Sequence, residues 1–286
     1  MLCVFFKNAS EKTSFNTICV TRAIVNLYIL LALFYLIFLP TALLGYTPIL
    51  STPVSAFLIA SGNAFYAGNA DVTLLSALNR FCALFFPLRY SRLCAVKPTL
   101  VILGIIYGFR VGETINELVL SLTIRDCWLY FSPLSLTWHL TRTEECDPYQ
   151  SVVSTYILIF FATTAVNIFT FLKLTCFYRK KNDPNSKRKE KKNIRLFFQT
   201  VLQDFLYVID LSFTFYFSQM SDERLWTFLS GTFIWQLLHS IDGLIMIMFN
   251  EQLAFLKSCL RSAPPSRTGQ QGNDPIRISS SRTVVD

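Results

Sequence analysis

Apolar residues are concentrated in long, almost uninterrupted runs, and polar residues gather in the segments between them. Five such runs occupy residues 23–45, 54–78, 152–178, 194–218 and 226–249. A helix of about 20 apolar residues crosses the roughly 30 Å hydrocarbon core of a bilayer. The pattern therefore predicts membrane-spanning helices rather than the amphipathic helices of a soluble domain.

A sixth run is weaker because charges interrupt it. Residues 99–109 are apolar, Arg110, Glu113 and Glu117 follow, and apolar residues then resume. Offsets of three and four place the three charges on one helical face. Two interpretations stay open: a helix whose polar stripe faces its neighbours, or an interrupted helix. With this run included, the sequence predicts an all-α fold, a polytopic transmembrane helix bundle with six full spans.

The composition supports a membrane protein without catalytic machinery. Hydrophobic residues make up 52% of the chain and charged residues 15%, whereas soluble domains carry about 25% charged residues. The eight cysteines form no C-x-x-C pair and there are only two histidines, so no metal site is expected. Motifs such as G-x-S-x-G and H-E-x-x-H are also missing from the sequence. We therefore expect neither an enzyme nor a cofactor.

The basic residues predict the orientation in the membrane. The net charge is +8. If the loop after the first span lies outside, most Lys and Arg fall on the opposite side, including the basic connector at residues 179–195. The positive-inside rule makes that side the cytoplasm and places the C-terminus there. Anchoring beside anionic lipid accounts for the positive charge, so the expected partner is the bilayer and not nucleic acid.

The sequence divides into a helical domain, residues 1–262, and a tail, residues 263–286. The tail is rich in Pro, Ser, Gly and Arg, which predicts a disordered cytoplasmic segment. An amphipathic stretch just before it, residues 251–261, is expected on the membrane surface. It contains Cys259, for which palmitoylation and a free thiol are the alternatives.

The loop at residues 125–150 is predicted to lie outside and to be closed by a disulfide. It contains Cys127 and Cys146, and the exterior is a compartment that permits oxidation. A bridge between these two residues would order the loop over the mouth of the bundle.

Polar side chains inside the spans predict a buried polar core. A carboxylate at mid-membrane costs about 2.5 to 3.5 kcal/mol on insertion scales, so it tends to face the bundle interior with a partner. The predicted core consists of Asn63, Asn69, Asp71, Gln199, Gln203, Asp204, Asp210 and His239, with Asp242 beside it. Such a core could act as a switch, or as static interhelical hydrogen bonds worth only about 0.6 kcal/mol each.

One segment resembles a known family. Asn79, Arg80 and Phe81 are followed by Phe-Pro-Leu-Arg-Tyr at residues 86–90. This segment is similar to the signature at the end of helix three in the nematode serpentine receptors of class X. Weaker similarities extend the resemblance over roughly residues 7–256. The resemblance implies a seven-transmembrane G-protein-coupled receptor with a chemosensory role, lying in the plasma or ciliary membrane and lacking most of helix one.

The resemblance also implies roles for particular residues. G-protein coupling or switching would involve Asn79, Arg80, Phe81, Tyr90, Asp242 and Asn250. Arg80 stands where rhodopsin-like receptors keep Asp-Arg-Tyr, and Asn79 replaces the acid. The implied partners are a heterotrimeric G protein and an unknown small-molecule or peptide ligand. For Arg80 the alternative is a snorkelling arginine that fixes topology. For the whole chain the alternatives are a truncated receptor product that does not signal, and a small transporter or channel.

Overall fold

The computed structural model describes residues 13–46, 52–125, 129–141, 149–178 and 184–249. Within these ranges the chain forms long helices and one short β-hairpin.

The first helical rod has three consecutive segments: α2 (Ser14–Ile29), the π-helical η2 (Leu30–Phe38) and α3 (Leu39–Leu44). The backbone N–H of Asn16 donates to Oγ1 of the capping residue Thr13. The helix therefore begins well before residue 23, where the apolar run begins. Pro40 lacks an N–H and crowds the preceding turn, which accounts for the wide η2 turns before it.

The longest helix, α4 (Thr52–Phe85), lies at the centre of the fold and packs against α2, α6, α7 and α8. It extends past residue 78, the predicted end of its apolar run, so Asn79, Arg80 and Phe81 are helical. A short helix, α5 (Pro87–Leu93), follows and has a proline in its first turn.

The weak sixth run is a continuous helix, α6 (Val96–Leu120), followed by the π-helical η3 (Ser121–Arg125). The helix is therefore not interrupted at its charges, and only part of the expected polar stripe faces a neighbouring helix, because Glu113 and Glu117 are exposed. Arg110 faces α4, where its Nε lies 2.7 Å from Asp71 Oδ2. The ion pair lets the helix continue through the charges without interruption.

The segment predicted as a loop contains a hairpin of strands β1 (Leu129–Ser132) and β2 (Thr137–Leu140). The strands are antiparallel, with Leu129 opposite Leu140. The turn between them is closed by the Leu136 amide, which donates to the Ser132 carbonyl, and Leu136 has a φ of 54°.

The C-terminal half of the fold is helical. Its elements are α7 (Tyr149–Tyr178), α8 (Pro184–Phe215), the 3-10 turn η4 (Phe217–Met220), α9 (Arg224–Phe228), the π-helical η5 (Leu229–Phe233) and α10 (Ile234–Phe249). Helix α8 starts inside the basic connector, before residue 194, because Lys, Arg and Glu are good helix formers. Pro184 occupies its first position, where a missing N–H costs nothing.

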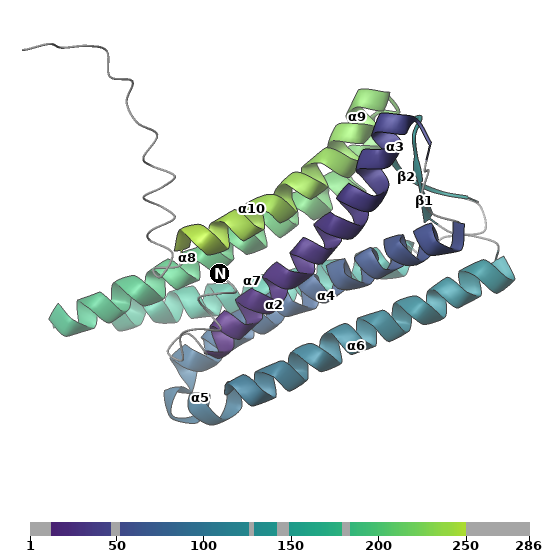
Figure 1. The fold of residues 1–286 in the computed structure, drawn as a ribbon. Helices are drawn as coiled ribbons and strands as arrows, with labels where there is room; N and C mark the ends of the chain where they lie inside the picture. The colour runs from purple at the N-terminus through teal and green to yellow at the C-terminus, as the bar shows by residue number, and fades with distance from the viewer. Residues whose placement is uncertain (1–12, 47–51, 126–128, 142–148, 179–183, 250–286) are drawn as a thin grey trace, which may run out of the picture.

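Figure 1 shows an elongated bundle with α5 at one end and the hairpin at the opposite end, beside α3 and α9. We call these the α5 end and the hairpin end. The turn of the hairpin is held on the helices by two hydroxyl groups. Thr232 Oγ1 donates to the Leu136 carbonyl at 2.8 Å, and Thr227 Oγ1 donates to the Ser135 carbonyl at 3.4 Å.

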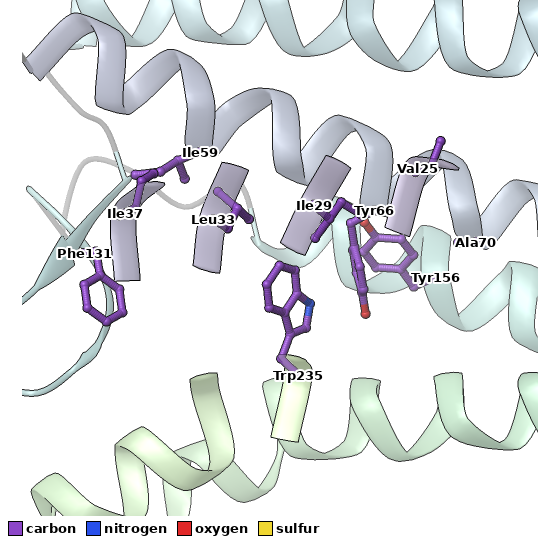
Figure 2. Close-up of a cluster of buried hydrophobic side chains, with 10 residues drawn as sticks. All are labelled: Val25, Ile29, Leu33, Ile37, Ile59, Tyr66, Ala70, Phe131, Tyr156 and Trp235. Carbon is purple, nitrogen blue, oxygen red and sulfur yellow. The ribbon is translucent and has the colours of Figure 1, made fainter. Parts of the chain in front are cut away.

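The apolar core lies between α2, α4, α7 and α10 and extends to the hairpin. Ile29, Leu33 and Ile37 of the first rod are almost completely buried. Figure 2 shows Trp235 extending from α10 toward Ile29 and Tyr66, and Phe131 of β1 at the far side of the same cluster.

The outer surface of the bundle is apolar. Four of the helical segments in the described ranges are long and apolar enough to cross a membrane: Ser14–Leu44, Val96–Thr123, Ser154–Cys176 and Ile194–Met220. Only 11% of the most apolar window of Val96–Thr123 is buried, so its other side chains require an apolar solvent. The helices α4 and α10 do not meet this criterion of length and composition within the described residues, and both carry polar side chains of the bundle interior.

Candidate functional site

A buried ion pair between α2 and α10 lies at the centre of the polar interior. Arg22 Nε is 3.1 Å from Asp242 Oδ2, and only 8% and 4% of these residues is exposed. Nε is not aligned for a hydrogen bond, but Nη1 donates to Thr73 Oγ1 of α4 at 3.2 Å. Each ion neutralises the other, which is what allows both charges to lie inside an apolar bundle.

Asn26 extends this pair to two further helices. Its Nδ2 donates to Asp242 Oδ2 at 2.7 Å, and its Oδ1 accepts from Asn69 Nδ2 of α4 at 2.7 Å. Tyr107 of α6 donates to Asn69 Oδ1 at 2.8 Å. The two asparagines therefore form a hydrogen-bonded chain that runs from α10 through α2 and α4 to α6.

Gln203 connects α8 to the same carboxylate. Its Nε2 donates to Asp242 Oδ1 at 2.7 Å, and 1% of the residue is exposed. Asp242 thus forms an ion pair with Arg22 and accepts hydrogen bonds from Asn26 and Gln203. Arg22 and Asn26 lie on α2, and Gln203 lies on α8. We call Arg22, Asn26, Asn69, Thr73, Tyr107, Gln203, His239 and Asp242 the polar network.

Asp210 lies closer to the hairpin end, among aromatic rings. Tyr66 donates to its Oδ2 at 2.7 Å, and 3% of Asp210 is exposed. A cavity separates Asp210 from the polar network. Its lining consists of Arg22, Asn26, Asn69, Gln203, Leu206, Tyr207, Asp210, Leu238, His239 and Asp242.

Arg80 contacts α8 at the α5 end. Its Nη1 donates to the Phe197 carbonyl at 3.3 Å, and its guanidinium carbon is 5.7 Å from the centre of the Phe197 ring. Arg80 Nε also donates to the Ser76 carbonyl, but Nη2 has no partner among the described residues. Arg80 therefore contacts α8 through a carbonyl and a ring rather than through a carboxylate.

The residues beside Arg80 join α4 to its surroundings. Ser14 Oγ, in the first turn of α2, donates to Asn79 Oδ1 at 2.9 Å and is 3.2 Å from the Tyr90 hydroxyl of α5. Phe81 stacks on Phe85 with ring centres 4.2 Å apart. Asn79 therefore fastens α2 to α4.

The structure separates some of the residues expected in one polar core. Asp71 pairs with Arg110, which also bonds Glu113, at the edge of the bundle. Asp204 accepts from Asn167 of α7 at 2.6 Å. Asn63 is exposed on α4, so its expected place in the core is corrected, whereas Gln199 is buried. Asn69, Gln203, His239 and Asp242 do come together.

Several expected sites fall outside the described residues. These are Asn250, the predicted disulfide partners Cys127 and Cys146, and the lipidation candidate Cys259. Within the described ranges, no three His, Cys, Asp or Glu side chains converge as a metal site would.

Sequence reasoning missed two central members of the network, Arg22 and Asn26. Arg22 directly precedes the apolar run that begins at residue 23, and Asn26 lies inside that run. Their spacing of four residues, which places both on one helical face, was the available signal.

Comparison with known proteins identifies the family. Residues 1–250 match the model of the serpentine type seven-transmembrane G-protein-coupled chemoreceptors, Srx. Serpentine receptor class X 45 of Caenorhabditis elegans is 28% identical over 250 residues, a match that covers 79% of this chain. The chain spans just under two thirds of that relative's length, 66%. With apolar helices that can cross a bilayer, the chain is a multi-pass membrane protein that belongs to the serpentine class X family of chemoreceptors.

Proposed function

We propose that this protein is a chemosensory receptor that binds a ligand toward the hairpin end and activates a heterotrimeric G protein at the α5 end. The observation that carries the proposal is the polar network. It joins α2, α4, α6, α8 and α10 through hydrogen bonds made by side chains that are buried, or half-buried in the case of Tyr107. A change near Asp242 alters the contacts of all these helices at once, which is what a receptor requires to transmit a signal.

The distribution of charge supports an orientation with the α5 end in the cytoplasm. Arg89 and Arg92 of α5 and the nearby Lys97 are all exposed there. Cations beside a span are retained on the cytoplasmic side. The hairpin end would then face the outside, and the C-terminus would be cytoplasmic.

Arg80 is the proposed link between the helices and the G protein. In the structure it joins α4 to α8 through the Phe197 carbonyl and ring. An agonist that favours a conformation with α8 displaced would release the guanidinium toward the cytoplasm. Asn79 cannot hold Arg80 as an acid would, and it binds Ser14 instead. The contact to α8 is therefore the proposed restraint on the resting state.

The proposal is tested by nucleotide exchange on purified G proteins, with the receptor reconstituted in lipid nanodiscs. Phe197→Ala removes the ring beneath Arg80, so we expect a basal exchange rate several-fold above wild type. Arg80→Ala removes the group that contacts the G protein, so we expect exchange to fall to the rate of empty nanodiscs.

Arg224→Ala is the matched control, because Arg224 is an exposed arginine of α9 at the hairpin end. Its exchange rate should equal that of wild type. If a panel of G proteins showed the same exchange rate with wild type, Phe197→Ala and Arg80→Ala, the proposed coupling would be refuted.

A further inference from the structure

Asp210 is a buried carboxylate whose charge the described residues do not balance. The charged groups that line the cavity are Arg22, Asp210 and Asp242. Arg22 is paired with Asp242, and Asp210 makes no salt bridge among the described residues. Its Oδ1 atom also lacks a hydrogen-bond partner there. An unpaired acceptor of this kind is costly inside a bundle unless a ligand or a proton satisfies it.

His239 adds a second free acceptor to the lining. The Asn26 amide group donates to Asp242, so its oxygen, Oδ1, faces His239 Nδ1 at 3.2 Å. Because that oxygen only accepts, Nδ1 must carry the proton in the neutral ring, a tautomer assigned from the network. Nε2 is then an acceptor, and it has no partner within the described part of the chain.

Tyr66, which donates to Asp210, belongs to a cluster of aromatic rings. The ring of Tyr66 lies 5.6 Å from that of Tyr207, 6.0 Å from Tyr156, 6.2 Å from Trp235 and 5.7 Å from His239. The close approach of Tyr66, Tyr156 and Trp235 can be followed in Figure 2. The faces of such rings attract cations, most strongly when water is excluded.

The cavity between Asp210 and His239 has the size of a head group. The centre of a water-sized sphere can occupy a volume of about 20 Å³ in this cavity. That volume suffices for one water molecule or one ammonium group. Asp210 lies near the end of α8, which reaches η4 at the hairpin end. Asp210 therefore lies on the side of the cavity that is nearer to the outside in the proposed orientation.

We propose that the ligand of this receptor is an organic amine whose ammonium group binds Asp210 in this cavity, beside the aromatic cluster of Tyr66, Tyr156, Tyr207 and Trp235. This inference rests on the proposed receptor function and specifies its ligand. The ammonium donates to Asp210 Oδ1 and to His239 Nε2, and its charge balances the carboxylate. The cavity accommodates the head group only, so the rest of the ligand separates the aromatic rings. That separation is the change that the polar network passes on to α8.

The test compares two probes of nearly equal shape on the purified full chain in nanodiscs. Phenethylamine is cationic at neutral pH, and 2-phenylethanol is its neutral counterpart. We expect wild type to bind phenethylamine at least about tenfold more tightly than the alcohol, measured by the shift in thermal unfolding with probe concentration. In Asp210→Asn the side chain keeps its shape but loses its charge, and we expect the preference to disappear.

Asp210→Glu tests whether a loss of the preference in Asp210→Asn is due to misfolding. It keeps the charge, so it should retain part of the preference for phenethylamine. Asp71→Asn is the matched control, since it neutralises a carboxylate that pairs with Arg110 away from the cavity, and it should bind both probes as wild type does. Equal affinities of wild type for the two probes, an unchanged preference in Asp210→Asn, or equal protection by the same concentration of Na⁺ would each overturn the proposal.

The assay contains no G protein, which keeps the two proposals separable. Amine binding without any nucleotide exchange would contradict the receptor function and leave the site intact. Exchange that responds to Phe197→Ala, with no amine preference, would retain the receptor function and reject the ligand class.

Discussion

Asp242 is the residue on which the polar interior depends most. It accepts from Asn26 and Gln203 and forms the ion pair with Arg22. A buried ion pair adds little net stability compared with well-packed apolar residues, but removing one partner leaves an uncompensated charge. The pair therefore matters mainly because it determines which helices meet. Removing one partner should cost more stability than removing both.

This asymmetry predicts the outcome of a double-mutant cycle. Arg22→Leu and Asp242→Asn should each lower the free energy of unfolding by about 3 kcal/mol or more, because each leaves a buried charge alone. The double variant should recover part of the loss, since no charge remains unpaired. Tryptophan fluorescence during thermal unfolding in detergent measures the effect.

The exposed Arg224 serves as the control for this cycle, because Arg224→Leu removes a cation that is not buried. Its melting temperature should match wild type. Additive losses in the double variant would show that Arg22 and Asp242 do not act as a pair.

At the residue scale, the sequence predicted which polar residues lie inside the bundle better than it predicted the residues that they contact. Asp242, Gln203, Asn69 and His239 were expected inside because polar groups in apolar spans turn inward. The choice of partners depends on the rotation of each helix, which the sequence does not specify. Asp71 was expected in the core but lies where α6 can supply Arg110.

Among the elements, the hairpin contributes the least expected feature. Its turn places Leu136 at a φ of 54°, a conformation that costs energy for a residue with a branched side chain. The Leu136 carbonyl accepts from Thr232 of η5. A Cβ added at Gly231 of η5 would lie 2.6 Å from Thr137 Oγ1, so the hairpin approaches the helix backbone closely.

The contact with Thr232 predicts a local effect of mutation. Thr232→Val keeps the side-chain shape but removes the donor, so the hairpin should open more readily by about 1 kcal/mol, or roughly fivefold in exchange rate. Hydrogen exchange at residues 129–140 measures this opening. Ser240→Ala is the control, because Ser240 Oγ donates within its own helix to the Gln236 carbonyl. Unchanged protection of the hairpin in Thr232→Val would contradict the account.

Element boundaries were predictable where apolar runs end and less so elsewhere. The sequence located every long helix, because each contains an apolar run. It placed the starts of α2 and α8 too late, since both begin in polar residues. The hairpin was missed because its two strands are only four residues each.

For the whole molecule, the proposed orientation of the bundle rests on charge and is open to direct measurement. Leu134 in the hairpin turn is 82% exposed and Leu88 of α5 is 95% exposed. In intact cells, Leu134→Cys should react with a membrane-impermeant maleimide above the wild-type background, whereas Leu88→Cys should react only after the cells are permeabilised. The reverse pattern would invert the proposed topology.

The native Cys94 should add little to labelling at the α5 end. Burial, together with the neighbouring Cys82, raises the pKa of the Cys94 thiol to about 11. At neutral pH, well below that pKa, the thiol stays protonated and reacts slowly, because the thiolate is the nucleophile.

The central proposal is that the polar network, together with the Arg80 contact at the α5 end, holds α8 in its resting position. Gln203→Leu removes the bond from α8 to Asp242 and leaves the Arg22–Asp242 pair in place. Gln199→Leu is the matched control, since no hydrogen bond joins Gln199 to α10 among the described residues. The distance between spin labels at positions 88 and 198, carried on noncanonical amino acids, reports the separation of α5 from α8.

Pulsed electron paramagnetic resonance on the reconstituted protein gives the distribution of this distance. We expect a second, longer population in Gln203→Leu that is absent from wild type and from Gln199→Leu. Identical distributions in all three proteins would contradict the claim that the polar network controls the α5 end.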